Sequence, residues 1–222
     1  MRTPSPLQSH FGNTACVLAR WATMALFCAG LMPVLAGTAA AAQQGALTLQ
    51  LNLAQMVEQS QFVVLGRVTA VKAEPHPQYT NLDTVVVTLQ VLDPIKGSPG
   101  AELTFRQYVF DVNDRNTKLG YRIGEEVALL LRTPSAQGLT SPVGFEQGRF
   151  HVERDSANNR VLRNGTDNAA LFSGLDQTAP NLKGRLSSSV QRMVAEHQSG
   201  PISYADFKSF VQSALANGQP AQ

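Results

Sequence analysis

The stretch 83–97 constrains the fold more than any other part of the chain. Four apolar residues recur at every second position along it, and they are Val85, Val87, Leu89 and Val91. A period of two places these side chains on one face of an extended strand and the intervening polar residues on the other. Pro94 has no backbone N–H and Gly97 favours a turn, so the strand is expected to end there. The sequence therefore predicts a half-buried strand at the centre of a small β core.

Similar patterns predict further elements on both sides of this strand. Additional strands are expected over 62–71, 103–110, 126–132, 148–154 and 160–163. Asn52 and Gln55 have capping-box spacing at the start of a helix over 53–59, and helical spacing recurs from Leu186 and again from Ser203. Gly66 lies inside the first strand and indicates a bulge or bend. The remaining segments, 74–78, 111–120 and 164–181, are predicted to be two loops and a poorly patterned linker.

The order of these elements indicates the fold class. Because the strands do not alternate with long helices, a parallel sheet is not expected. The pattern favours a mainly β (α+β) domain, an antiparallel barrel or sandwich with helices at one end. We expect three parts: residues 1–42 as a signal peptide, residues 43–165 as a β-barrel domain, and residues 166–222 as a linker and a C-terminal helical pair packed on the same domain.

The N-terminal 42 residues have the features of an export signal. Arg2 and Arg20 supply positive charge, an apolar run covers 21–35, and three alanines follow at 40–42. Cys28 allows a lipidation site as the alternative, although the bulky residue directly before it fits such a site poorly. We expect cleavage after about Ala42 and therefore a mature chain in the periplasm or outside the cell, with no stable membrane anchor.

Cleavage at that point would change the chemistry available to the protein. Both cysteines, Cys16 and Cys28, would be removed with the signal, so neither a disulfide nor a thiol site is expected. The full chain has 18 Lys and Arg against 16 Asp and Glu, and the signal holds two arginines and no acid. The mature chain would be formally neutral, which argues against a nucleic-acid partner.

Several parts of the pattern resemble a known group of proteins. They are Leu53–Ser60 leading into Phe62–Val68, then Val85–Gly97, Tyr121–Leu131 and Gln147–Phe150. Together they resemble exported bacterial proteins whose order of elements is similar to the netrin-like domain, an OB-type barrel also found in tissue inhibitors of metalloproteases. The resemblance implies a five- to six-stranded antiparallel OB/netrin-like barrel with one N-terminal helix and two C-terminal helices. The animal inhibitors place an N-terminal cysteine on the protease zinc, and no cysteine in the expected mature chain matches it.

The titratable residues do not form a motif of known chemistry. His76, His151 and His197 are scattered and lack metal-ligand spacing, so neither a metal nor another cofactor is expected. The segment 111–122 begins like a calcium loop, but Arg115 stands at its fifth position, where an oxygen ligand is needed. The serines at 187–189 lie within a helical pattern and lack the glycines of a nucleophile elbow.

Two predicted loops supply the best candidates for a binding surface. The residues chosen from these loops and from the neighbouring strand are His76, Tyr79, Tyr108, Phe110, Asp111, Asp114 and Arg115. Alternation places Tyr108 and Phe110 on one face of their strand, where they either cover the core or form an exposed patch. The sequence favours an exported, non-enzymatic module that binds a protein or an envelope component. The alternative is a hydrolase whose site is assembled from dispersed acids and histidines.

Overall fold

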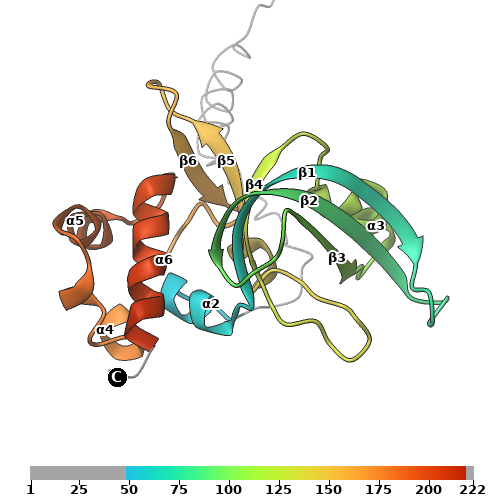
Figure 1. The fold of residues 1–222 in the computed structure, drawn as a ribbon, viewed down its shortest axis with the longest axis horizontal. Coiled ribbons are helices and arrows are strands. Elements are labelled where there is room, and N and C mark those ends of the chain that lie inside the picture. The colour runs from blue at the N-terminus through green and yellow to red at the C-terminus, as the bar shows by residue number, and fades with distance from the viewer. Residues whose placement is uncertain (1–48, 219–222) are drawn as a thin grey trace, which may run out of the picture. The chain divides into compact units, whose positions relative to one another are not determined.

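The computed structural model describes residues 49–218 (Figure 1). The predicted signal peptide, Cys16 and Cys28 therefore lie outside the described residues. Within residues 49–218, none of the helices is both long enough and apolar enough to cross a membrane.

The described chain is built on one antiparallel sheet of seven strands in the order β3-β2-β1-β4-β5-β6-β7 (Figure 1). The strands are β1 (Phe62–Pro75), β2 (Asp83–Lys96), β3 (Glu102–Tyr108), β4 (Glu126–Leu131), β5 (Arg149–Arg154), β6 (Arg160–Asn164) and β7 (Ile202–Ser203). The α+β class and the antiparallel pairing are confirmed. The predicted barrel is wrong, because β3 and β7 are the two ends of the sheet and do not pair with each other. The number of strands is seven rather than five or six.

The central strands of the open sheet are apolar on both faces. Val63 and Leu65 of β1 belong to one core with the helices, whereas Val64 and Val68 of the same strand belong to a second core on the opposite face. Strand β4 divides its side chains between the two cores in the same way. The helices cover the first core, whereas ten of the twelve buried residues of the second core come from β1 to β4 themselves, and the other two are Val109 and Tyr121.

The central strand β2 has the predicted inward face but a different end. Val85, Val87 and Leu89 are fully buried. The strand continues through Pro94 to Lys96, so the prediction that it ends at the proline is wrong. The pairing with β1 shifts by one residue beside Pro94, and a bulge of this kind tolerates the missing N–H. Another register shift lies beside Gly66, which confirms the bulge predicted there.

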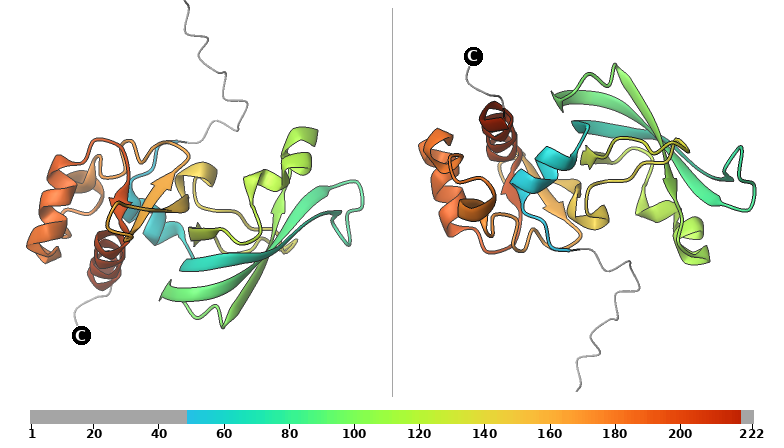
Figure 2. Two further views of the ribbon diagram at one scale, coloured as in Figure 1. Left: turned by 90° about the horizontal axis from the view of Figure 1, so that it is seen from above. Right: turned by 90° about the horizontal axis from the view of Figure 1, so that it is seen from below.

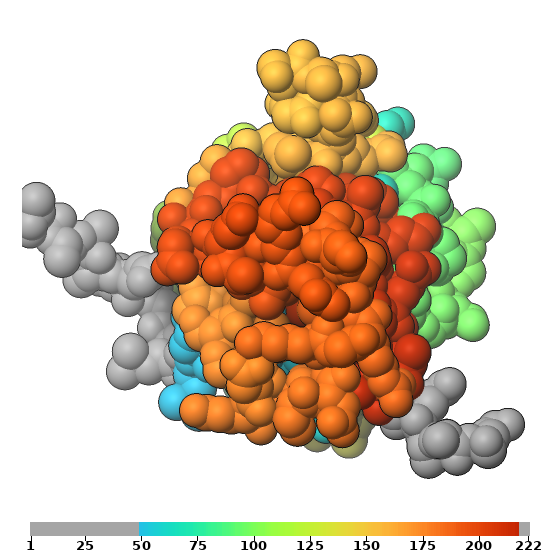
Figure 3. Space-filling model, turned by 90° about the vertical axis from the view of Figure 1, so that its left-hand side faces the viewer, coloured from blue at the N-terminus to red at the C-terminus, as the bar shows by residue number. Residues whose placement is uncertain are grey.

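Five α-helices accompany the sheet in the described part of the chain. They are α2 (Leu53–Gln59), α3 (Val112–Thr117), α4 (Leu175–Thr178), α5 (Ser188–Glu196) and α6 (Tyr204–Gly218). The predicted capping box is confirmed, because the Asn52 side chain accepts from the Gln55 N–H and the Gln55 side chain accepts from the Asn52 N–H, each at 3.0 Å. Helices α4 and α5 lie on the outer side of α6, away from the sheet (Figure 2). Figure 3 views the face that these C-terminal helices form, with the β5–β6 hairpin projecting beyond them.

Three segments predicted to be irregular are ordered. The segment 111–120 is not a loop, since α3 and a 3₁₀ turn (Lys118–Gly120) occupy it. The segment 164–181 is not a linker, because Leu171 and Leu175 are buried in the helical core and Asn168 is fully buried. Strand β1 extends into the predicted loop at 74–78 as far as Pro75. Apolar residues show no regular short-range spacing in these three segments. Helix capping and contacts with residues distant in the sequence keep them ordered.

Candidate functional site

Three aromatic rings form a connected cluster where β3 ends. The rings of Tyr108 and Phe110 meet edge to face, with centroids 5.0 Å apart, and those of Phe110 and Phe145 do so at 5.5 Å. Such arrangements stabilise a pair by about 0.5–1.5 kcal/mol beyond burial. Tyr108 is half-buried, but Phe110 keeps 54% of its surface exposed. The cluster is therefore a supported aromatic surface rather than part of the core.

A hollow of about 250 Å³ lies beside this cluster, and we call it the Phe110 hollow. Its lining residues come from the end of β3, from the segment after β4 and from the turn that holds Phe145; they are Gln107, Tyr108, Phe110, Arg132, Thr133, Ser135, Leu139, Thr140, Ser141 and Phe145. Most of the exposed wall is apolar, and the polar groups around it are hydroxyls, one amide and one guanidinium. This composition is typical of a site that holds a small ligand or one group of a larger ligand.

The amide of Gln107 is the most unusual polar group in this lining. Gln107 is 6% exposed, and its Oε1 is buried without a hydrogen-bond partner among the described residues. A buried acceptor left unpaired costs about 1–3 kcal/mol, so folded proteins rarely retain one.

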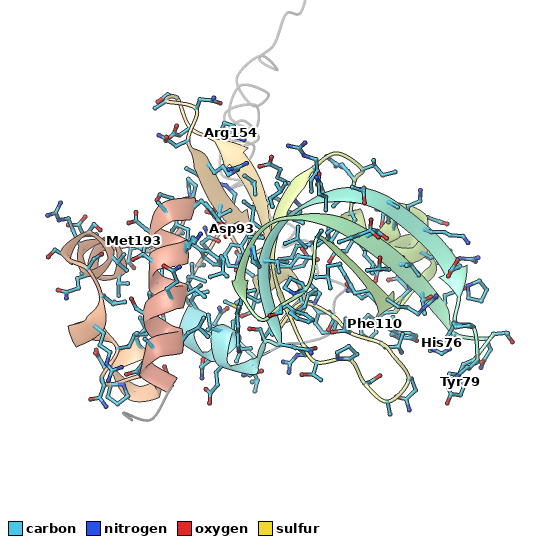
Figure 4. All side chains as sticks on the ribbon, in the orientation of Figure 1. His76, Tyr79, Asp93, Phe110, Arg154 and Met193 are labelled. Carbon is cyan, nitrogen blue, oxygen red and sulfur yellow. The ribbon has the colours of Figure 1, made fainter. Side chains whose placement is uncertain are left out.

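The hairpin between β1 and β2 carries His76 and Tyr79, whose rings lie 5.0 Å apart (Figure 4). The sequence placed His76 in an exposed loop, and this is wrong, because only 3% of the residue is exposed. Its Nδ1 accepts hydrogen bonds from the backbone N–H groups of Gln78 and Tyr79, each at 3.2 Å. The proton is therefore on Nε2, which donates to the Gln137 carbonyl oxygen at 2.9 Å. His76 organises the turn, whereas Tyr79 remains 47% exposed.

The segment 134–141 connects this hairpin with the aromatic cluster. At one point its Gln137 carbonyl accepts from His76, and at another the Thr140 N–H donates to the Arg106 carbonyl of β3 at 2.8 Å. Leu139 forms a parallel bridge with Arg106 and also lines the Phe110 hollow. Phe110, His76 and Tyr79 consequently lie toward the same end of the sheet (Figure 4).

The charged residues predicted for the surface have mainly local partners. Asp111 is the N-cap of α3, and its side chain accepts from the Asp114 N–H at 2.8 Å. Arg115 lies 3.6 Å from the Asp83 carboxylate in an exposed ion pair. Burial, together with the neighbouring acids Asp111 and Glu146, raises the pKa of Asp114 above its usual range. These groups position α3 next to Phe110, and nothing in their geometry assigns them a ligand.

A buried arginine holds the turn that carries Phe145. Arg149 is 7% exposed, and its guanidinium carbon lies 4.6 Å from the centre of the Tyr121 ring. The same guanidinium forms an ion pair of 2.6 Å with Glu146, which follows Phe145 directly, and donates to the Leu119 carbonyl. Burial raises the pKa of the Tyr121 hydroxyl, so the ring stays neutral under the cation. Arg149 therefore connects the Phe145 turn to the 3₁₀ turn that follows α3.

Two other hollows lie among the helices. One of about 410 Å³ is bordered by α4 and α5 on the face shown in Figure 3, with the Asp176–Lys183 ion pair at its edge. The other, of about 570 Å³, lies between α2, the end of β2 and α6. Lys96 lines it, but the amine already donates to the Val57 and Ser60 carbonyl oxygens at the end of α2. Among residues 49–218, no group of three or more His, Cys, Asp or Glu side chains is arranged to hold a metal ion.

Sequence reasoning identified part of this site. Tyr108 and Phe110 were predicted and are brought together, and Tyr79 is exposed as expected. Gln107 and Phe145 were missed. The signal for Phe145 was an isolated aromatic residue in a turn-rich segment. The signal for Gln107 was its place in the alternation, which puts it on the same face of the strand as Phe105 and Val109, both of them buried.

Comparison with models of known protein families, with curated proteins and with solved structures gives no match to this chain. The functional argument therefore depends on the geometry of the Phe110 hollow and its surroundings.

Proposed function

We propose that the protein is an exported, non-enzymatic module that binds its ligand at the surface around Phe110. The observation that carries the proposal is the exposure of this ring above two supporting aromatic residues, beside a hollow. Aromatic residues held in place in this way contribute most of the binding energy at many recognition surfaces. Exposed Val112 follows close by in the chain and extends the apolar character of the surface.

Export is part of this proposal and rests on the sequence of residues 1–42. Positive charge, an apolar run and a small-residue site occur there in the order that a signal peptidase recognises. We propose a protein or a component of the cell envelope as the ligand of such an exported module. The likeness to the netrin-like domain remains a proposal, and it does not transfer protease inhibition to any residue.

A hydrolase is the alternative, and the positions of its candidate groups favour it less. None of the three hollows described above is lined by a histidine. His151 lies 3.7 Å from Glu125, but this pair belongs to β5 and the turn before β4 and lines none of these hollows. His76 is occupied by its turn and by the Gln137 carbonyl. A general base needs to reach a substrate proton in a pocket, so binding without chemistry is the better supported reading.

Binding to isolated cell envelopes of the producing cell tests the proposal. Labelled protein is titrated with envelopes, and the Phe110→Ala variant is compared with Ile123→Ala, a matched loss of an exposed apolar side chain outside the hollow. We expect Phe110→Ala to weaken binding about ten-fold or more and Ile123→Ala to leave it unchanged. Both variants are first required to melt like the unmodified protein. Equal binding by all three proteins would contradict the proposal.

A further inference from the structure

We propose that three arginines around Glu126 form a second binding site, which takes a phosphate group. The arginines are Arg67, Arg154 and Arg160, and together with Glu126 we call them the arginine cluster. The inference goes beyond the proposed function, because it does not depend on Phe110 or on the hollow beside it.

Four neighbouring strands, in the order β1-β4-β5-β6, bring the arginine cluster together. Arg67 of β1 is paired directly with Glu126, the first residue of β4. Arg154, the last residue of β5, is paired with Arg160, the first residue of β6, on the projecting hairpin (Figure 4). Alternation places all four side chains on the face that bears the core shared with the helices, whose members from the same strands include Leu65, Ala128, Phe150 and Leu162.

One carboxylate serves three cations in this cluster. The Glu126 oxygens lie 2.8 Å from Arg67, 2.8 Å from Arg160 and 3.6 Å from Arg154. Hydrogen bonding from Arg160 lowers the pKa of Glu126 to about 2, so this carboxylate is ionised at neutral pH. Three guanidinium cations against one carboxylate leave an excess of two positive charges.

Two nearby acids have partners on the other face of the sheet. Glu125 pairs with His151 at 3.7 Å, and Glu153 pairs with Arg163 at 3.5 Å. His151 and Arg163 lie opposite each other across β5 and β6, and alternation turns both away from the arginine cluster. These acids therefore do not neutralise it.

Two further acids are engaged by groups of their own. The Asp93 carboxylate lies 2.6 Å from the Lys208 amine. Asp155 accepts from the backbone N–H groups of Ala157 and Asn159 and so closes the hairpin turn. Among residues 49–218, Glu126 is the one carboxylate that forms an ion pair with the three arginines, so their excess charge stays uncompensated.

The pairing of Arg154 with Arg160 is unfavourable for the sheet by itself. Like charges directly opposite each other on neighbouring strands destabilise the pairing. Breaches of a local rule of this kind are expected mainly at functional sites. An anion between the two guanidiniums would turn the repulsion into attraction.

The free donors of the cluster suit a phosphate group. Within residues 49–218 the three guanidiniums make four hydrogen bonds, three to Glu126 and one from Arg154 to the Asn158 carbonyl oxygen, and they carry many more N–H donors than these. Their side chains are between 35% and 48% exposed, which leaves room for a ligand to approach. Arginines bind phosphate through paired, charge-assisted hydrogen bonds. A phosphate monoester carries about −1.5 to −2 charge at pH 7 and so matches the excess, whereas a single carboxylate would neutralise half of it.

Inorganic phosphate is the first probe. The protein, in the form that accumulates in the producing cell, is titrated with phosphate while its backbone amide resonances are followed by NMR. Chloride keeps the ionic strength constant, so that general screening does not change. We expect saturable shifts at Arg154 and Arg160. Absence of saturable shifts at millimolar phosphate, together with absence of binding to the vesicles described below, would overturn the inference.

Variants of the β5–β6 hairpin separate a site from a general effect of charge. Arg154→Gln is expected to weaken phosphate binding about ten-fold. The matched control is Arg163→Gln, which removes the same charge from the other face of the same hairpin and should leave binding unchanged; the two arginine side chains are 46% and 39% exposed. Equal weakening by both variants, or none by Arg154→Gln, would refute the inference.

Glu126→Gln gives a change in the opposite direction. It removes the carboxylate that competes with phosphate for the guanidiniums, so we expect binding to become tighter by about five-fold or more. A structural ion-pair network without a ligand does not produce this gain. The variant is first required to melt cooperatively at neutral pH, and weaker phosphate binding by the folded variant would contradict the inference.

Vesicles distinguish a lipid headgroup from a soluble phosphate compound. The protein is sedimented with phosphatidylcholine vesicles that contain either phosphatidic acid, a phosphate monoester, or phosphatidylglycerol, a phosphate diester. Binding to the first alone, and its loss in Arg154→Gln, would support a lipid as the source of the phosphate group. Saturable shifts with inorganic phosphate but no binding to vesicles would support a soluble phosphate monoester.

Discussion

Replacing Val87 by aspartate tests the organisation of the central strand. Val87 is fully buried and lies opposite Val71 of β1 and Phe105 of β3 in one apolar core. Losing a buried valine costs about 1.5–3 kcal/mol, and a buried carboxyl group without partners adds about 1–3 kcal/mol even when it is protonated. The expected total of about 2.5–6 kcal/mol is comparable with the whole stability of many domains.

Thr88→Asp is the matched control, because the next residue faces the other side of the sheet. Thr88 is half-buried, and its hydroxyl shares a hydrogen bond of 3.0 Å with that of Thr104. Loss of that bond costs about 0.5–1.5 kcal/mol. Urea unfolding of both variants measures the difference. Equal destabilisation, or a harmless Val87→Asp, would refute the assignment of the inward face.

Three further predictions address other parts of the chain. Hydrogen bonding from Arg160, with Arg67 and Arg154 nearby, lowers the pKa of Glu126 from 4.5 to about 2. Because the folded-state pKa is depressed, the ionised Glu126 stabilises the fold above about pH 4.5, and this stabilisation is lost as the pH falls toward 2. Exposure of the arginines reduces it to about 1–2 kcal/mol. The melting temperature of Glu126→Gln should therefore fall less steeply in acid than that of the unmodified protein. His76→Phe removes three hydrogen bonds and should destabilise the folded protein by about 1–3 kcal/mol. One of these bonds holds Gln137, so faster protease cleavage within 134–141 is the check. Mass spectrometry should find a mature N-terminus after about Ala42, and an intact terminus or a lipidated Cys28 would contradict this.

The local elements of the fold were readable from sequence, whereas their assembly was not. Period-two alternation located β2, and the spacing of Asn52 and Gln55 located α2, because both signals act over a few neighbouring residues. Closure of the sheet was predicted wrongly, since it depends on which strands meet at the edges. Strand β7 has only two residues and is defined by its pairing with β6, which short-range patterns do not contain.

The site was predictable to a similar extent. The aromatic pair Tyr108 and Phe110 is close in sequence and was identified, but its contact with Phe145 requires the return of the chain through β4. Asp111 was read as a group for a ligand, although the same residue type is a strong helix N-cap. Prolines on both sides of His76 suggested an exposed loop, and only the structure reveals the hydrogen bonds that bury it.

Site-specific photocrosslinking in the producing cell tests the central claim most directly. A photoreactive benzoylphenylalanine replaces Phe110 in one strain and Ile123, equally an exposed apolar residue but outside the hollow, in another. We expect irradiation to produce a covalent adduct between the protein and its ligand, of higher mass than the protein alone, from position 110 and none from position 123. Adducts of similar yield from both positions, or none from position 110, would contradict the claim that the surface around Phe110 holds the ligand.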